Sequence, residues 1–424
     1  MSINEAWLKI TAQNNGLKSS EDDVKRAKLK STSAESMYLP SVTITGSYTH
    51  LSEPIEIEGD LDILSLKPGG IPFTLELSEQ DIFLADLHVL WPLYTGGKID
   101  AAQDIYAAQL DEARAKQEMK RDEEFLKLVK YYYGVIVSKS LLLTREEAQK
   151  ALQLHYENAK KLKEQGQIAK IELLNAQVKL DDARIETAKA RHKYELAASA
   201  LVAITKSNAT PSSKLFVNAT IKGEEYYKNE TRQNYAALRV LDAKESQSKA
   251  LVTIKEAGWH PEVVAYGNVN LYKDDSPLME TLPQWFAGVM VKIDLLQRKD
   301  RAQEVQIAAL LGEKVRHLRA QAVEDLALLV EKTYKEMLSD YEEFNALDSS
   351  VALAKENYKL RNIAFKEGLS TSVELVDAEM FLLGAKTKRL NAAYNFVQKI
   401  SQLSVLSGNR AMFFEIADSS EEIE

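Results

Sequence analysis

The chain has 424 residues and a net charge of −9, with Lys and Arg scattered among Asp and Glu, so nothing favours nucleic acid as a partner. Cysteine is absent, which excludes disulfides, thiolate metal sites and cysteine nucleophiles. Because there are only 9 Pro and 17 Gly, little material is left for turns, and long uninterrupted elements are expected.

No stretch reaches the roughly 18 consecutive apolar residues that a membrane helix needs, so only strands could carry this chain across a bilayer. The first residues, Met1 to Glu5, lack the basic and apolar regions of a secretion signal. The protein is therefore either cytosolic or a secreted protein whose signal has been removed.

The first part of the chain alternates between helical and strand-like patterns. Residues 3–35 contain few helix breakers and predict a helix that ends before Pro40. Apolar and polar residues then alternate over 41–51 and again over 81–94, which predicts two half-buried strands. The acidic residues 52–80 between them are expected to form a long exposed loop.

A helical hairpin follows the second strand. From residue 98 to residue 165 there is no Pro and one Gly, which predicts a helix on the order of 100 Å long. Gly166 then ends this helix at a natural cap position, and a second helix is predicted over 170–204. A Ser-, Thr- and Asn-rich break follows at 205–214.

The same order of elements then recurs. Alternation predicts strands over 262–272 and 284–296, and helices are predicted over 298–367 and 371–406, with Gly368 between them. The longer helix carries an apolar residue at every seventh position, the spacing of a coiled-coil seam: Val323, Val330, Met337, Phe344, Val351, Tyr358 and Phe365. The second helices carry shorter stripes, namely Ile171, Val178 and Ile185 in the first copy and Val376, Leu383, Leu390 and Val397 in the second.

From Leu93 onward, the recurrence keeps one offset of 202 residues without an insertion. Tyr156 maps to Tyr358, Gly166 to Gly368, Glu172 to Glu374, Leu180 to Leu382 and Ala190 to Ala392. A constant offset over more than a hundred residues indicates one duplicated structural unit.

The four predicted strands leave two architectures open. Strands that are apolar on one face and tipped with Trp and Tyr suit the lipid side and aromatic girdles of an outer-membrane barrel. A hairpin of a water-soluble β-sandwich would show the same alternation. In lipid, the sheet edges would have to be closed by identical neighbouring chains.

Three local signatures, each present in this sequence, carry a family resemblance. They are Pro-led strand starts at 39–40 and 260–261, the strand-to-helix exit at 91–97, and the matching tip patterns after Gly166 and Gly368. With them, the duplicated organisation resembles the outer membrane efflux protein family, the TolC-like export ducts of Gram-negative bacteria. Each signature is weak alone, but signatures that occur in both copies, with the tip patterns in register, are specific together.

The resemblance implies a mainly α fold with a small β part. Long α-helical hairpins would form an α-barrel, and four membrane β-strands per chain would form a twelve-stranded barrel in a homotrimer. The implied function is the outer membrane channel of a tripartite efflux or type I secretion system, a passive duct with a periplasmic extension and a removed signal peptide. The implied partners are a periplasmic adaptor, an inner-membrane pump and outer membrane lipid, with no catalysis and no cofactor.

Four segments are predicted along the chain. Residues 1–204 form the first structural repeat, with an N-terminal helix, two strands and a long helical hairpin. Residues 205–231 form an equatorial linker, and residues 232–407 repeat the helix, strands and hairpin. Residues 408–424 are expected to form an acidic tail that is disordered from residue 419.

Acidic residues follow both hairpin tips. The resemblance places Glu374 and Asp377 at the tunnel mouth, where symmetry would make rings that select or bind cations. Glu172 and Asn175 are their lower-ranked counterparts in the first copy. The simpler alternative is that these acids only stabilise the N-terminus of a helix.

The tips also hold candidates for a gate and for docking. In family members an aromatic residue before the tip Gly and a basic residue after it help to hold the entrance closed. Phe365 and Ser370 occupy those positions here, so any lock uses other pairs. The candidates for adaptor docking are Lys163, Gln165, Gly166, Gln167, Gly368 and Leu369, although a plain helical turn explains the glycines equally well.

Other readings are less well supported. The six histidines are dispersed without an i, i+4 pair, so no metal site is expected. A periplasmic adaptor would have one hairpin between soluble β-domains, and a cytosolic coiled-coil scaffold would lack the strands. An enzyme is least supported, because no nucleophile, base and cofactor constellation is present.

Overall fold

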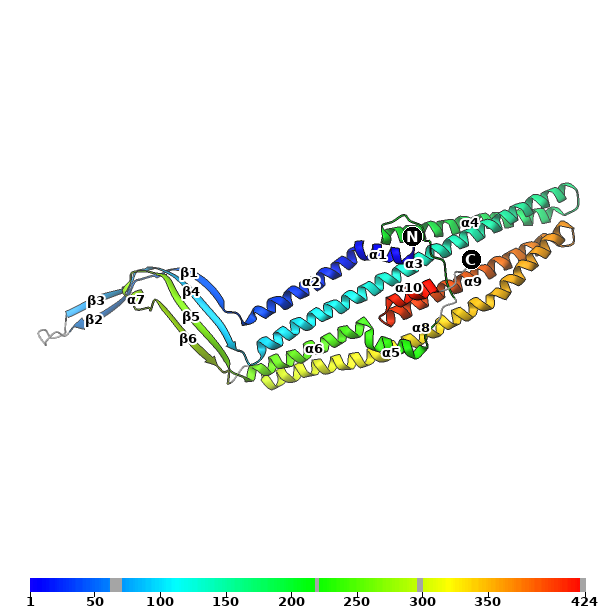
Figure 1. Cartoon of the computed structure of the whole chain (residues 1–424). Coiled ribbons are helices and arrows are strands. Elements are labelled where there is room, and N and C mark those ends of the chain that lie inside the picture. The colour runs from blue at the N-terminus through cyan, green and yellow to red at the C-terminus, as the bar shows by residue number, and fades with distance from the viewer. Residues whose placement is uncertain (62–70, 218–220, 296–299, 420–424) are drawn as a thin grey trace. The chain divides into compact units, whose positions relative to one another are not determined.

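The computed structural model describes residues 1–61, 71–217, 221–295 and 300–419. They are mainly helical with a small β part, which confirms the predicted fold class (Figure 1). The chain divides into two compact units: Met1–Lys25, Asp111–Asp242 and His317–Glu424 form the first, and Arg26–Leu110 and Ala243–Arg316 form the second. Each unit combines parts of both repeats, and the four segments predicted along the sequence stay a prediction.

The second unit contains a four-stranded antiparallel sheet with the order β1–β4–β5–β6. Its strands are β1 (Ser41–His50), β4 (Asp81–Tyr94), β5 (Glu262–Lys273) and β6 (Trp285–Lys292). These are the four strands that the alternation predicted, although β6 is shorter than expected. Strands of the two copies pair directly where β4 meets β5, and β1 and β6 form the edges.

The strand register gives this sheet one apolar face and one mixed face. One row of paired residues on the apolar face runs through Ile44, Leu87, Val269 and Trp285. The neighbouring row, on the opposite face, runs through Thr43, His88, Asn268 and Phe286. Ile44, Trp285 and Val269 are 68%, 66% and 39% exposed, so the sheet leaves an apolar surface uncovered in the single chain.

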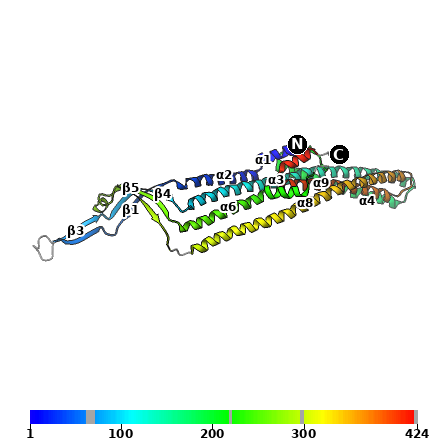
Figure 2. The ribbon, with the colours of Figure 1, turned by 60° about the horizontal axis from the view of Figure 1, so that its bottom comes forward.

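The prediction of a loop over residues 52–80 is wrong. Strands β2 (Ile55–Leu61) and β3 (Ile71–Ser78) form an antiparallel hairpin that continues from β1 and β4 (Figure 2). Ile57 pairs with Leu75 in one row, while Glu56 pairs with Glu76. Acidic residues occupy alternate positions of β2, and they concealed the alternation that predicts a strand. Residues 62–70, between these strands, lie outside the described residues.

The N-terminal helix is divided in two. Helices α1 (Ile3–Gln13) and α2 (Asn15–Glu35) meet at Asn14, whose side-chain Oδ1 accepts a hydrogen bond from the backbone N–H of Leu17. This cap starts α2 and explains the break within the predicted helix over 3–35. Short 3₁₀ turns, η1 (Ser36–Tyr38) and η2 (Ala257–Trp259), precede β1 and β5.

Both predicted helical hairpins are present. The first consists of α3 (Lys98–Glu164) and α4 (Lys170–Thr205), and the second of α8 (Arg301–Lys366) and α9 (Ser372–Leu406). The seven residues of the predicted seam on α8 are all buried or half-buried. Between the hairpins lie α5 (Glu224–Asn234), which begins inside the predicted linker, α6 (Ala236–Glu256), and the short α7 (Pro277–Glu280) between β5 and β6.

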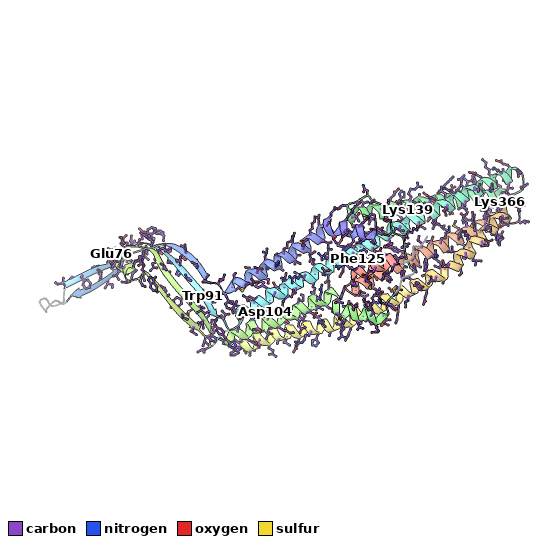
Figure 3. All side chains as sticks on the ribbon, viewed as in Figure 1. Glu76, Trp91, Asp104, Phe125, Lys139 and Lys366 are labelled. Carbon is purple, nitrogen blue, oxygen red and sulfur yellow. The ribbon has the colours of Figure 1, made fainter. Side chains whose placement is uncertain are left out.

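The main hydrophobic core lies in the first unit, around Phe125 of α3 (Figure 3). The Phe125 ring meets Trp7 of α1 at a centroid distance of 5.5 Å and Phe413 at 5.4 Å. Phe413 belongs to α10 (Arg410–Ser419), which lies within the predicted acidic tail. Met412, Phe413 and Ile416 are buried at helical spacing, so this part of the tail is anchored in the core. Residues 420–424 lie outside the described residues.

Candidate functional site

The two hairpin tips share one turn geometry. Gly166 and Gly368 have φ values of 75° and 74°, in the left-handed region that favours glycine. In each turn a backbone N–H reaches back over the glycine, from Gln167 to the carbonyl of Leu162 at 2.9 Å and from Leu369 to that of Ala364 at 2.8 Å. This is the hydrogen-bond pattern of a helix that ends at a left-handed residue.

The residues predicted for adaptor docking are exposed. Leu369 is 82% exposed although it is apolar, and its neighbour Lys366 marks the end of α8 in Figure 3. The remaining candidates, Lys163, Gln165, Gly166, Gln167 and Gly368, are exposed as well. Their surface is available for a partner, and docking there stays a prediction.

The acidic residue Glu374 is engaged in a capping box. Its carboxylate accepts hydrogen bonds from the Ser370 hydroxyl at 2.7 Å and the Thr371 backbone N–H at 3.0 Å, while the Thr371 hydroxyl accepts from the Glu374 N–H. Arg361 of α8 lies 3.4 Å from the same carboxylate. The Thr371 backbone hydrogen bond, followed by the Ser370 hydroxyl, lowers the pKa of Glu374. The simpler alternative, an acid that stabilises a helix start, therefore describes Glu374 well.

The other candidates for an acidic ring differ in exposure. Asp377 is exposed, whereas Glu172 and Asn175 in the first copy are half-buried. The Oε2 atom of Glu172 is buried and has no hydrogen-bond partner among the described residues. Asp377 is therefore the candidate most accessible to ions, and the ring itself stays a prediction.

Phe365 packs against a residue that the sequence analysis did not select. Its ring is buried and lies 4.5 Å, centroid to centroid, from the ring of His155 on α3. The Nε2 atom of His155 forms a hydrogen bond with the hydroxyl of Ser372 at the start of α9. The other gate candidate, Ser370, is half-buried, and its hydroxyl donates a hydrogen bond to Glu374 in the same turn.

His155 occupies a core position of α3, and that pattern was the missed signal. Ala148, Leu152, His155 and Ala159 follow each other at steps of three or four and are all buried. Burial lowers the pKa of His155 from 6.5 to about 4. Its Nδ1 atom is buried without a hydrogen-bond partner in the described part of the chain. His155 is therefore neutral at pH 7.

Glu379 is a second buried titratable group that the sequence analysis did not select. It lies seven residues beyond Ser372, two turns further along α9, and is 7% exposed. Burial raises the pKa of Glu379 to about 8, so its carboxyl is mostly protonated at pH 7. Its side chain borders a cavity of about 450 Å³ among α3, α8 and α9, together with Tyr358, Lys355 and Lys386.

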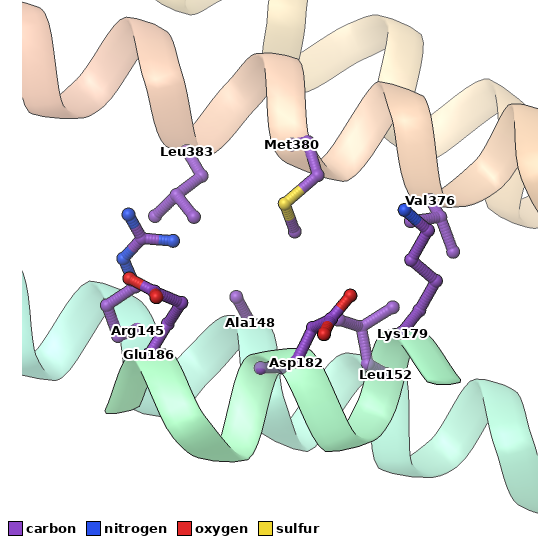
Figure 4. A pocket seen from close by; sticks show the side chains of 10 residues that line it. Arg145, Ala148, Leu152, Lys179, Asp182, Glu186, Val376, Met380 and Leu383 are labelled. Atoms are coloured by element: carbon purple, nitrogen blue, oxygen red, sulfur yellow. The ribbon is translucent and has the colours of Figure 1, made fainter. Parts of the chain in front are cut away.

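A smaller cavity shows how α9 packs against the first hairpin. It measures about 90 Å³ and lies among α3, α4 and α9. In Figure 4, Val376, Met380 and Leu383 of α9 point toward the first hairpin, and Lys179, Asp182 and Glu186 of α4 border the space. The predicted α9 stripe is therefore buried here, since Val376 and Leu383 are 2% and 6% exposed.

The part of the chain that the structure describes contains no group of three His, Asp or Glu side chains that could hold a metal ion. None of its helices has the length and apolar character needed to cross a membrane.

Comparisons with known proteins identify a family and solved structures that are similar to this chain. The family model described as "Outer membrane efflux protein" matches residues 9–205 and 228–409. No curated protein sequence matches the chain. Among solved structures, the outer membrane protein VceC from Vibrio cholerae is similar, with 14% identity, coverage of 96% of each chain and a TM-score of 0.76.

Two further channel structures are similar. The CmeC outer membrane channel of Campylobacter jejuni shares 14% identity, covers 99% of this chain and 90% of its own, and has a TM-score of 0.75. The open state of the Neisseria gonorrhoeae MtrE outer membrane channel shares 14% identity, covers 96% and 89%, and has a TM-score of 0.77. At these identities the likeness shows the fold.

The rival expectations do not fit this structure. An adaptor was expected to have one hairpin and a scaffold to lack strands, whereas the described residues form two hairpins and a four-stranded sheet. The family model covers most of the chain and spans both copies of the repeat. The chain belongs to the outer membrane efflux protein family.

Proposed function

We propose that this chain is the outer membrane channel of a tripartite efflux or type I secretion system, and that three copies form one passive duct. The observation that carries the proposal is the open sheet, with β1 and β6 at its edges and one exposed apolar face. Unpaired backbone groups at an edge are costly in lipid, so β6 would pair with β1 of the next copy. Three copies then close a barrel of twelve strands.

Uncovered apolar stripes on the helices support the same assembly. Ile171, Val178 and Ile185 on α4 are 59%, 58% and 54% exposed, and on α8 Leu353 and Leu360 are 65% and 57% exposed. The α4 stripe repeats every seven residues, and the two α8 residues are also seven positions apart, the spacing at which one helix packs against another. Neighbouring copies would cover them and close an α-helical tunnel.

The proposal assigns an environment to each end of the chain. The strands lie in outer membrane lipid after a signal peptide has directed the chain across the inner membrane. The hairpin tips reach into the periplasm, where they meet an adaptor that links the duct to an inner-membrane pump. The matching family and the channel structures named above support this assignment.

Planar-bilayer recording tests the duct directly. Purified protein is expected to conduct ions and to migrate as a trimer in SDS before heating. A stable monomer that needs no detergent and does not conduct would contradict the proposal.

The same recordings test the acidic ring. The double variant Glu374→Ala/Asp377→Ala is expected to lower cation selectivity, and Asp377→Ala alone should account for most of the loss, because the Glu374 carboxylate is engaged in the cap. Glu356→Ala, at an exposed position of α8, is the matched control. Unchanged selectivity in the double variant would exclude the ring.

A further inference from the structure

One side chain of the first hairpin holds both helices of the second hairpin. His155 forms its hydrogen bond with Ser372 at the start of α9, and its ring lies edge-on to Phe365 near the end of α8. These two partners stand on either side of the turn at Gly368. Ser372 and Phe365 are 2% and 5% exposed, so the contact lies inside the protein.

We propose that neutral His155 is a positioning residue that latches the tip of the second hairpin to the first, and that protonation of His155 releases this tip. The latch rests on the proposed function and on the expected position of the tips at the entrance of the duct. Acidification of the periplasm would then favour an open entrance.

The contact favours a neutral imidazole, because protonation is costly at this buried position. Protonation gives both ring nitrogens an N–H, but the buried Nδ1 atom has no acceptor within the described residues. A buried charge without a partner is strongly unfavourable. The pKa of His155 is about 4 when it is latched and returns toward 6.5 when it is released. The latch is therefore complete above pH 6.5 and is lost as the pH falls toward 4.

Charged and titratable groups lie on every helix near the latch: Tyr156 on α3, Glu172 on α4, Tyr358 and Arg361 on α8, and Glu374 and Glu379 on α9. Arg361 and Glu374 pair with each other, and burial is the cause of the lowered pKa of His155. None of these carboxylates stabilises the imidazolium.

Glu379 responds to pH in the opposite direction. Burial raises its pKa to about 8, so acidification favours its packed form. It lies about 10 Å beyond Ser372 along α9, since seven helical residues span that length. We expect Glu379 to stay packed when only the tip is released. The Glu379→Gln variant removes the titration of Glu379 and leaves that of His155.

The absence of cysteine allows a direct measurement of the tips. Spin labels attached to Gln167→Cys and Leu369→Cys, one on each exposed tip, report the distance between the hairpins of the full-length protein in detergent. From pH 7.5 to pH 5, the ratio of released to latched populations is expected to rise by roughly 30-fold, as the two pKa values of His155 dictate.

Three further variants, each in the labelled protein, make the test specific. His155→Gln keeps a hydrogen-bonding group without a titration and is expected to show a population ratio independent of pH within about twofold. Ser372→Ala is expected to raise the released population already at pH 7.5. Glu379→Gln is expected to keep the rise at pH 5.

The outcomes separate the latch from the duct. A pH response in His155→Gln equal to that of the unaltered protein, or no response in the unaltered protein, would overturn the latch. Failure of the unaltered protein to conduct at any pH would overturn the proposed function, and the tip distances would still decide whether His155 holds the two hairpins together.

Discussion

The second helices of the two hairpins, α4 and α9, come from one duplicated unit but differ in packing. α9 buries 17 of its 35 residues, whereas α4 buries 6 of its 36. The seven-residue stripe that includes Val376 and Val397 is buried on α9, while the stripe with Val178 is exposed on α4. One copy has become an internal helix, and the other presents an apolar surface.

The first residues of these two helices also differ, with more side-chain contacts at the start of α9 than at the start of α4. Thr371 starts α9 with a complete capping box, and His155 contacts the next residue. Ala169 starts α4 and provides no side-chain hydrogen bond. The second tip is therefore held by local and tertiary contacts, and the first tip by its backbone turn. The two copies of the hairpin therefore share one backbone turn but differ in the side-chain contacts around it.

The largest expected loss of stability comes from truncating a large core residue of α9. Phe396→Ala removes a fully buried ring and is expected to cost about 3–5 kcal/mol in the free energy of unfolding. Tyr194→Ala, at the equivalent position of α4, should cost less because Tyr194 is only half-buried. Chemical denaturation in detergent, followed by circular dichroism, measures both, and equal costs would remove the contrast between the helices.

The buried carboxyl of α9 offers a pH-dependent comparison, because the equivalent residue of α4 is Gln177. Since the pKa of Glu379 is raised to about 8, its stabilising contribution is fully present below pH 4.5 and is lost as the pH rises through 8. Between pH 4 and pH 7, the free energy of unfolding of Glu379→Gln should therefore rise by roughly 3 kcal/mol relative to that of the unaltered protein. A difference that does not change with pH would show that Glu379 is solvated.

The exposed stripe of α4 is tested by assembly. Val178→Asp places an unpaired carboxylate in the proposed contact between copies, which should cost at least about 2 kcal/mol and weaken association roughly 30-fold. Light scattering in detergent measures the loss of trimer, and circular dichroism should show an unchanged helix content. Lys179→Gln, at the next position, is the control, and an intact trimer in Val178→Asp would place the contact elsewhere.

The smallest effect concerns the helix caps. Thr371→Ala should cost about 0.5–2 kcal/mol, because it removes the capping box of α9. The converse change, Ala169→Thr, should stabilise α4 by a similar amount, since Glu172 already stands at the third helical position. The two N-cap residues, Ala169 and Thr371, have nearly the same backbone conformation. Thermal unfolding of the two variants tests the pair, and a destabilised Ala169→Thr protein would contradict this view.

Sequence patterns predicted most of the architecture because they are local. Alternation gave four strands, the seven-residue repeat gave the α8 seam, and Gly166 and Gly368 gave the ends of the long helices. The failures have local causes too. Acidic residues at every second position of β2 concealed the hairpin of β2 and β3. The charged end of the chain concealed the buried apolar side of α10.

The candidate site was only partly predictable. Phe365 was selected for its place before the tip glycine, but its partner His155 was set aside when the histidines were considered only as metal ligands. The contact between His155 and Ser372 joins residues 217 positions apart. No spacing rule within one helix connects such a pair.

The sequence by itself determined the duplicated unit, the ends of its hairpins and the period of its strands, because these follow from residues a few positions apart. Only the tertiary structure decided which apolar stripe is covered and which side chains meet behind the tips. Helices of similar pattern can pack in several ways, and the contacts between distant segments select one of them.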